Sequence, residues 1–175
     1  MGRDAAMRGP RVLAAVARVL LAVIASAPAI AQEAIYGDFG VALGQPFDPR
    51  MGQGTALLNG TTEATRFAPS YPLYLFREYY AILTPRTRLV AGILARSVEF
   101  STMPECVTHM NAVQGFLTRY GAPLLVSQTD REVMVQVDQG NRAAYLRCNR
   151  STRIHMELNY VDYQMLQLRA QEGGR

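Results

Sequence analysis

Two histidines and a scattered set of carboxylates are the side chains of this sequence that could carry catalytic chemistry. His109 and His155 belong neither to an H-E-x-x-H pattern nor to a Cys/His ligand pattern, so their spacing does not predict a metal site. Two carboxylates could cleave a glycosidic bond, but no spacing selects a pair. The available carboxylates are Glu78, Glu99, Glu105, Asp130, Glu132, Asp138, Glu157 and Asp162. We therefore assign no catalytic residue and expect no metal and no cofactor.

The absence of lysine from the sequence excludes several classes of enzyme. All 18 basic residues are arginine, whereas P-loop NTPases, pyridoxal-phosphate enzymes and Ser-Lys hydrolases need an ε-amine. The chain has no Gly-x-Ser-x-Gly nucleophile elbow, although a Ser-His-Asp triad assembled in space stays open. The sequence favours a non-enzymatic binding protein. The alternative is a small hydrolase of sugar or peptide bonds that uses a carboxylate or a histidine of the sheet.

Tyrosines and arginines of the predicted strands and turns form a candidate binding surface. Tyrosine suits such a surface because it combines an apolar ring with a polar tip. Strand alternation would place Tyr74 and Tyr80 on one face and Tyr79 on the other, so we expect at least one of them to be exposed. The arginines could face an anionic envelope component or protect a sheet edge. The candidate surface consists of Tyr74, Tyr79, Tyr80, Arg147, Arg153 and His155.

The two cysteines, Cys106 and Cys148, are predicted to form a disulfide. Cys106 lies in the apolar stripe of a predicted helix, and Cys148 shares a strand face with Ala144 and Leu146. The bond would close a loop of about 43 residues and contribute roughly 4 kcal/mol to stability. The alternative is a pair of free, buried cysteines.

Residues 1–31 have the parts of a secretory signal peptide. Unpaired arginines precede a short apolar run, and Ala29-x-Ala31 ends the segment with the small residues that signal peptidase requires. The apolar run is far shorter than the ~20 residues of a membrane span. We expect cleavage after Ala31, no membrane span in the mature chain, and a periplasmic or secreted protein. Met7 is an alternative start.

Removal of this segment leaves a nearly neutral chain. The full sequence has 18 basic and 14 acidic residues, and the segment contains four arginines and one aspartate. The net charge therefore falls from +4 to +1. A nearly neutral chain gives no electrostatic basis for binding nucleic acid. The expected partners are proteins or polysaccharides of the cell envelope.

The mature chain has patterns typical of an α+β protein. Segment 32–72 is rich in glycine, proline and threonine, and we interpret it as a loop-rich N-terminal arm with short strand pieces. Segment 73–175 shows the periodicity of a folded α+β domain. Apolar and polar residues mark five strands, over 73–83, 89–98, 133–138, 143–148 and 154–160.

A helix over residues 103–120 completes the predicted domain. Thr102 and Glu105 form a capping box, and Gly121 stands at the C-cap position. A short final helix is expected after Asp162. The main helix has an apolar face made by Cys106, Met110, Val113, Leu117 and Tyr120. The fold is expected to be an antiparallel sheet in β-β-α-β-β-β order, with this helix packed on one face.

Overall fold

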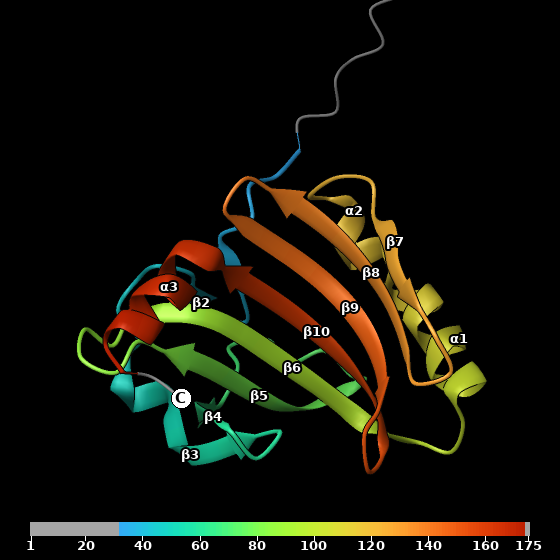
Figure 1. Ribbon diagram of the computed structural model, residues 1–175, viewed down its shortest axis with the longest axis horizontal. Helices are drawn as coiled ribbons and strands as arrows, with labels where there is room; N and C mark the ends of the chain where they lie inside the picture. Colours follow the sequence, from blue (N-terminus) through green and yellow to red (C-terminus); the bar gives the residue numbers. More distant parts are fainter. Residues whose placement is uncertain (1–31, 174–175) are drawn as a thin grey trace, which may run out of the picture. The chain divides into compact units, whose positions relative to one another are not determined.

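The computed structural model describes residues 32–173 (Figure 1). The predicted signal peptide and its cleavage site after Ala31 lie outside the described residues. The described residues form one compact unit. Within the described part of the chain, none of the helices is long and apolar enough to cross a membrane.

An eight-stranded antiparallel sheet is the framework of this unit, with the strand order β3-β4-β5-β6-β10-β9-β8-β7. Strands β3 to β6 form one half of the sheet and β7 to β10 the other, and within each half consecutive strands pair with each other. The two halves join where β6 pairs with β10. The predicted α+β class with an antiparallel sheet is confirmed. The strands are β3 (Gly52–Leu58), β4 (Thr62–Phe67), β5 (Phe76–Leu83), β6 (Val90–Phe100), β7 (Leu124–Gln128), β8 (Glu132–Gln139), β9 (Arg142–Arg150) and β10 (Ile154–Asp162).

The main helix covers one face of the sheet. Helix α1 (Met103–Val113) begins at Thr102, whose hydroxyl accepts a hydrogen bond from the Glu105 amide at 3.3 Å. The predicted single helix is bent at Gln114, after which α2 (Gly115–Thr118) continues. Its buried side chains pack into the core against β6, β9 and β10. Figure 1 shows α1 and α2 behind β7 and β8. A third helix, α3 (Tyr163–Gln171), packs against β6 and β10.

The element order differs from the predicted β-β-α-β-β-β pattern because the main sheet contains β3 and β4 before the first predicted strand and β7 after the helix. Strand β7 forms one edge of the sheet, and its residues Leu124, Leu125 and Val126 are exposed. A run of three apolar residues does not alternate, and for this reason the sequence pattern did not mark it as a strand.

Segment 32–72, which we expected to be a loop-rich arm, is an integral part of the same unit. It contributes β3 and β4 to the main sheet, where β4 pairs with β5. It also forms the small sheet of β1 (Gly37–Asp38) and β2 (Val41–Ala42) and a 3-10 turn, η1 (Pro49–Met51). Ile35, Phe39 and Leu43 are buried in the main core. Gly40 and Gly60, which have positive φ, serve the tight turns that follow β1 and β3.

Asp38 fastens this segment to the sheet. Its Oδ2 accepts a hydrogen bond from the Tyr160 hydroxyl at 2.7 Å and another from Arg119 Nη2 at 2.6 Å. Phe39, the next residue, packs edge-on against Tyr79 with ring centroids 4.9 Å apart. The N-terminal segment is thus fixed by a charge-assisted contact beside an aromatic one.

The predicted disulfide joins α1 to β9. Cys106 and Cys148 are both fully buried, their Cα atoms are 6.0 Å apart, and their sulfurs are bonded. The bond ties the helix to the strand that it covers.

Reduction of this bond should lower the free energy of unfolding by roughly 4 kcal/mol, the chain-entropy value for a loop of this length. The measurement is urea unfolding of the mature protein with and without dithiothreitol, with thiol labelling to verify reduction. A Cys106→Ala/Cys148→Ala variant serves as the control that the reductant must not affect. Equal stability of the oxidised and reduced wild-type protein would contradict the expectation.

Replacement of Tyr160 by phenylalanine should make the free energy of unfolding fall less steeply as the pH rises into the alkaline range. Burial, reinforced by the Asp38 carboxylate, raises the pKa of Tyr160 above its ordinary value of 10.0. Above about pH 10 the unfolded chain releases this proton and the folded chain keeps it, so unfolding becomes easier by up to about 1.4 kcal/mol per pH unit. Urea unfolding between pH 9 and about pH 11.5 measures the slope. Identical slopes for the wild type and Tyr160→Phe would show that the pKa of Tyr160 is not raised in the folded protein.

Candidate functional site

The face of the sheet opposite α1, which we call the open face, carries a row of alternating charges. Glu78 on β5 lies opposite Arg96 on β6, and Arg96 lies opposite Glu157 on β10. Glu157 in turn lies opposite Arg147 on β9. Side chains of directly opposed residues point to the same face, so strand pairing itself brings opposite charges together.

These residues belong to a longer chain of ion pairs, which we call the charge ladder. Its consecutive nitrogen–oxygen distances are 4.0, 3.9, 3.1, 2.5 and 3.6 Å. The three guanidinium groups and three carboxylates sum to zero charge, and the ladder crosses the sheet from β4 to β8. Its members, in order, are Arg66, Glu78, Arg96, Glu157, Arg147 and Glu132.

Glu157 is the buried centre of the ladder, with 4% of its surface exposed. Its Oε1 accepts from Arg96 Nε at 3.3 Å and Nη2 at 3.1 Å. Its Oε2 accepts from Arg147 Nε at 3.2 Å and Nη2 at 2.5 Å. A carboxylate has about four acceptor positions, and the two guanidinium groups occupy all of them. Glu157 therefore has no lone pair left with which to take a proton from a substrate.

The same contact affects Arg147. Burial opposes its positive charge, but the attraction of Glu157 and its hydrogen bonds outweigh burial and raise the pKa of the Arg147 guanidinium. Glu157 thus helps to keep the Arg147 guanidinium charged despite its burial.

A cavity of about 500 Å³, which we call the polar pocket, lies over the centre of the ladder. Two turns bound it: the β3–β4 turn at Asn59–Gly60, and the β9–β10 turn. Asn59 and Gly60 both have positive φ, 50° and 73°, as a tight hairpin turn requires. All the lining side chains are polar or charged, Gly60 apart. The pocket is lined by Asn59, Gly60, Arg96, Asn149, Ser151, Thr152, His155 and Glu157.

Two buried nitrogen atoms on β10 have no hydrogen-bond partner among the described residues: Nδ1 of His155 and Nδ2 of Asn159. They lie on either side of Glu157 along the strand and share the open face with it. A buried polar atom left unsatisfied costs on the order of 1–3 kcal/mol. The open face therefore retains unused hydrogen-bonding capacity next to the polar pocket.

The predicted binding surface is brought together only in part. His155 lines the polar pocket and Arg147 belongs to the ladder beneath it. Arg153, in the β9–β10 turn, pairs with Glu99 of β6. Tyr74 is exposed in the loop before β5. Tyr79 and Tyr80 are both buried.

Tyr79 and Tyr80 lie on opposite faces of β5, as strand alternation predicts, but other side chains cover both of them. The register shifts between Phe76 and Glu78, which places Phe76 and Tyr79 together in the main core. Tyr80 lies on the open face, in a small apolar cluster with Leu94, and Arg96 stands 5.8 Å from its ring. Neither buried tyrosine can form part of an exposed binding surface.

Sequence reasoning did not identify most of the pocket. From the sequence, Asn59, Asn149 and Ser151 could be assigned only to predicted turns. The sequence of a turn does not show over which face of the sheet the turn lies. Arg96 was not singled out, and Glu157 stood undistinguished among eight carboxylates. The alternation of Glu and Arg at matching strand positions is the signal that could have found both, once the strand register was known.

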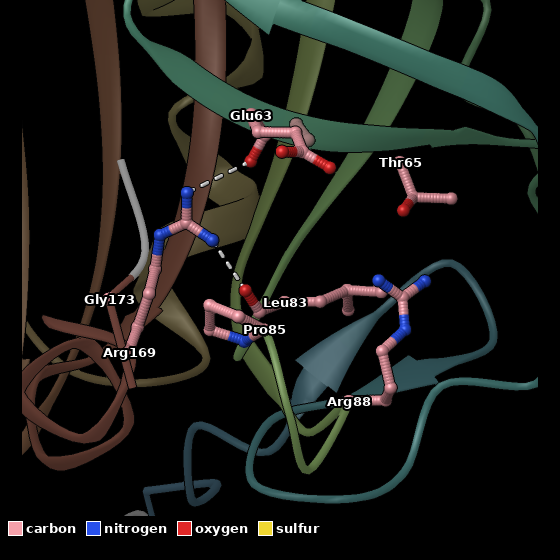
Figure 2. A pocket seen from close by; sticks show the side chains of 8 residues that line it. Glu63, Thr65, Leu83, Pro85, Arg88, Arg169 and Gly173 are labelled. Atoms are coloured by element: carbon pink, nitrogen blue, oxygen red, sulfur yellow. Dashed lines mark hydrogen bonds between the residues drawn. The ribbon is translucent and has the colours of Figure 1, made fainter. Parts of the chain in front are cut away.

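A second hollow, of about 330 Å³, lies beside α3 (Figure 2). Arg169, which is 8% exposed, donates hydrogen bonds from its guanidinium to the backbone oxygens of Leu83 and, at 3.2 Å, Glu63. Burial lowers the pKa of Arg169. Figure 2 shows Arg88 entering the hollow from the other side. Because Arg169 binds backbone of β4 and β5, it ties α3 to the sheet, and we regard this hollow as structural.

Comparison with known proteins gives no guide to the role of these hollows. No protein-family model, curated protein or solved structure matches the chain. Within residues 32–173, no three His, Cys, Asp or Glu side chains are grouped so that they could hold a metal ion.

Substitution of Glu157 should be far more damaging than substitution of Glu78. Glu157→Gln removes the negative charge between Arg96 and Arg147 and places an amide NH2 group beside their guanidinium groups. The free energy of unfolding should fall by about 3 kcal/mol or more. Glu78→Gln, at the more exposed end of the ladder, should lose less than about 1 kcal/mol. Urea unfolding at neutral pH compares the two. Equal losses would show that Glu157 is not the centre of the network.

Proposed function

We propose that the mature chain is an exported, non-enzymatic binding protein of the bacterial cell envelope, and that the polar pocket on its open face is the binding site. The observation that carries the proposal is a pocket of small-molecule size whose one carboxylate, among its lining residues, is fully engaged by two arginines. Such a pocket can hold a ligand, but among its lining residues it lacks a free carboxylate.

The alternative, a small hydrolase, has weaker support in the arrangement around His155. Hydrolysis of a glycosidic bond requires two carboxylates that can exchange protons with substrate and water. Glu99 lies opposite His155 in the sheet, but it is paired with Arg153. Glu157 lies two residues along the strand and is saturated by Arg96 and Arg147. Both carboxylates near the histidine are therefore held by guanidinium groups.

Two features support an envelope location. The pattern of residues 1–31 is that of a cleaved signal peptide. The buried Cys106–Cys148 disulfide suits the oxidising conditions outside the cytoplasm, where such bonds persist.

The proposal is tested by NMR titration of ¹⁵N-labelled mature protein with four classes of probe: neutral, anionic and cationic oligosaccharides, and uncharged peptides. At least one class should shift the amide signals of 59–60 and 149–152 and leave those around Arg88, in the second hollow, unchanged. No probe should be hydrolysed during prolonged incubation. Cleavage of a probe that is abolished by His155→Ala would establish the hydrolase instead, and shifts confined to other regions would place the binding site elsewhere.

A further inference from the structure

We infer that the ligand of the polar pocket is a neutral oligosaccharide, an inference that rests on the proposed binding function. Three properties of the pocket lead to this class: its charge, its hydrogen-bonding groups and the absence of aliphatic side chains among its lining residues.

The charge balance of the pocket selects against ionic ligands. Arg96 and Glu157, the two charged residues that line it, bind each other at 3.1 Å, and the ladder to which they belong has no net charge. An anionic ligand would have to compete with Glu157 for Arg96. A cationic ligand would find no free acceptor on Glu157 and would lie close to two guanidinium groups. A neutral ligand avoids both costs.

The hydrogen-bonding groups match a ligand rich in hydroxyls. Asn59 and Asn149 present amides, Ser151 and Thr152 present hydroxyls, and His155 presents an imidazole. Each of these groups can donate and accept, as the hydroxyls of a sugar do. Arg96 bonds to Glu157 through Nε and Nη2, so a guanidinium with five N–H groups keeps others that can donate to a sugar oxygen.

The lining argues against a peptide or a lipid as the ligand. Peptide recognition relies on apolar pockets for alternate side chains or on a free strand edge. The polar pocket has no apolar side chain in its lining and lies over the central strands β6 and β10 rather than at an edge. Its volume of about 500 Å³ lies within the range of small-molecule sites, ~300–1,000 Å³. Because the pocket offers little ring-stacking surface, we expect weak binding, with a Kd of roughly 0.1–1 mM.

The test is an NMR titration of the mature protein with tetrasaccharides that differ in charge. The neutral probes are cellotetraose, maltotetraose and N-acetylchitotetraose; the charged probes are the deacetylated chitosan tetramer and tetragalacturonate; an acetylated and amidated tetra-alanine represents peptides. At least one neutral saccharide should shift the amides of 59–60 and 149–152 and bind at least tenfold more tightly than either charged probe. Its Kd should not change when the NaCl concentration is raised tenfold.

Two variants locate the contacts. Asn149→Ala and Thr152→Val should each weaken neutral saccharide binding at least fivefold at an unchanged melting temperature, whereas Arg88→Ala, in the second hollow, should bind as the wild type does. If a charged or peptide probe shifts the same amide signals and has a lower Kd than every neutral saccharide, the ligand class is wrong and the binding function stands. If no probe shifts these amides, both the ligand class and the proposed function are wrong.

Discussion

A carboxylate in the middle of a sheet must have its charge compensated, and the compensation of Glu157 by Arg96 and Arg147 constrains everything on the open face. The three residues stand on adjacent strands in direct register. A slip of one residue on any of these strands would turn its charged side chain into the apolar core. The ion pairs therefore specify how β6, β10 and β9 align. They also form a polar surface without net charge, and Arg96 and Glu157 of this surface line the polar pocket.

The two faces of the sheet are organised by different forces. On the covered face, α1 and the N-terminal segment bury one continuous apolar core, and the Cys106–Cys148 disulfide crosses it. On the open face only a small apolar cluster forms, around Tyr80 and Leu94, and charge pairing replaces packing over the rest of the centre. The stability that this core provides allows the open face to keep unsatisfied groups such as the Asn159 amide without loss of the fold.

Local patterns predicted the elements well, and long-range geometry was what they could not supply. The capping box at Thr102 and the stripe through Cys106 gave the helix, and the strand parity of Cys148 gave the disulfide, since each depends on residues close in sequence. The burial of Phe39 was missed because glycine-rich sequence resembles a loop when its partners in space are unknown. Tyr79 and Tyr80 lie on opposite faces of β5, as alternation predicts, but their burial was missed because the residues that cover each face come from other segments. The charge ladder needed the register of six strands, which no single segment contains.

The most direct test of this account is the thermodynamic coupling between Arg96 and Arg147 through Glu157, measured by urea unfolding of Arg96→Met, Arg147→Met and the double variant. If Glu157 depends on both guanidinium groups, Arg147→Met should lower the free energy of unfolding by at least about 1 kcal/mol more in the Arg96→Met background than in the wild-type protein. This coupling should disappear in the Glu157→Gln background, where no buried negative charge remains to be compensated. Additive effects in both backgrounds would contradict the central role of Glu157.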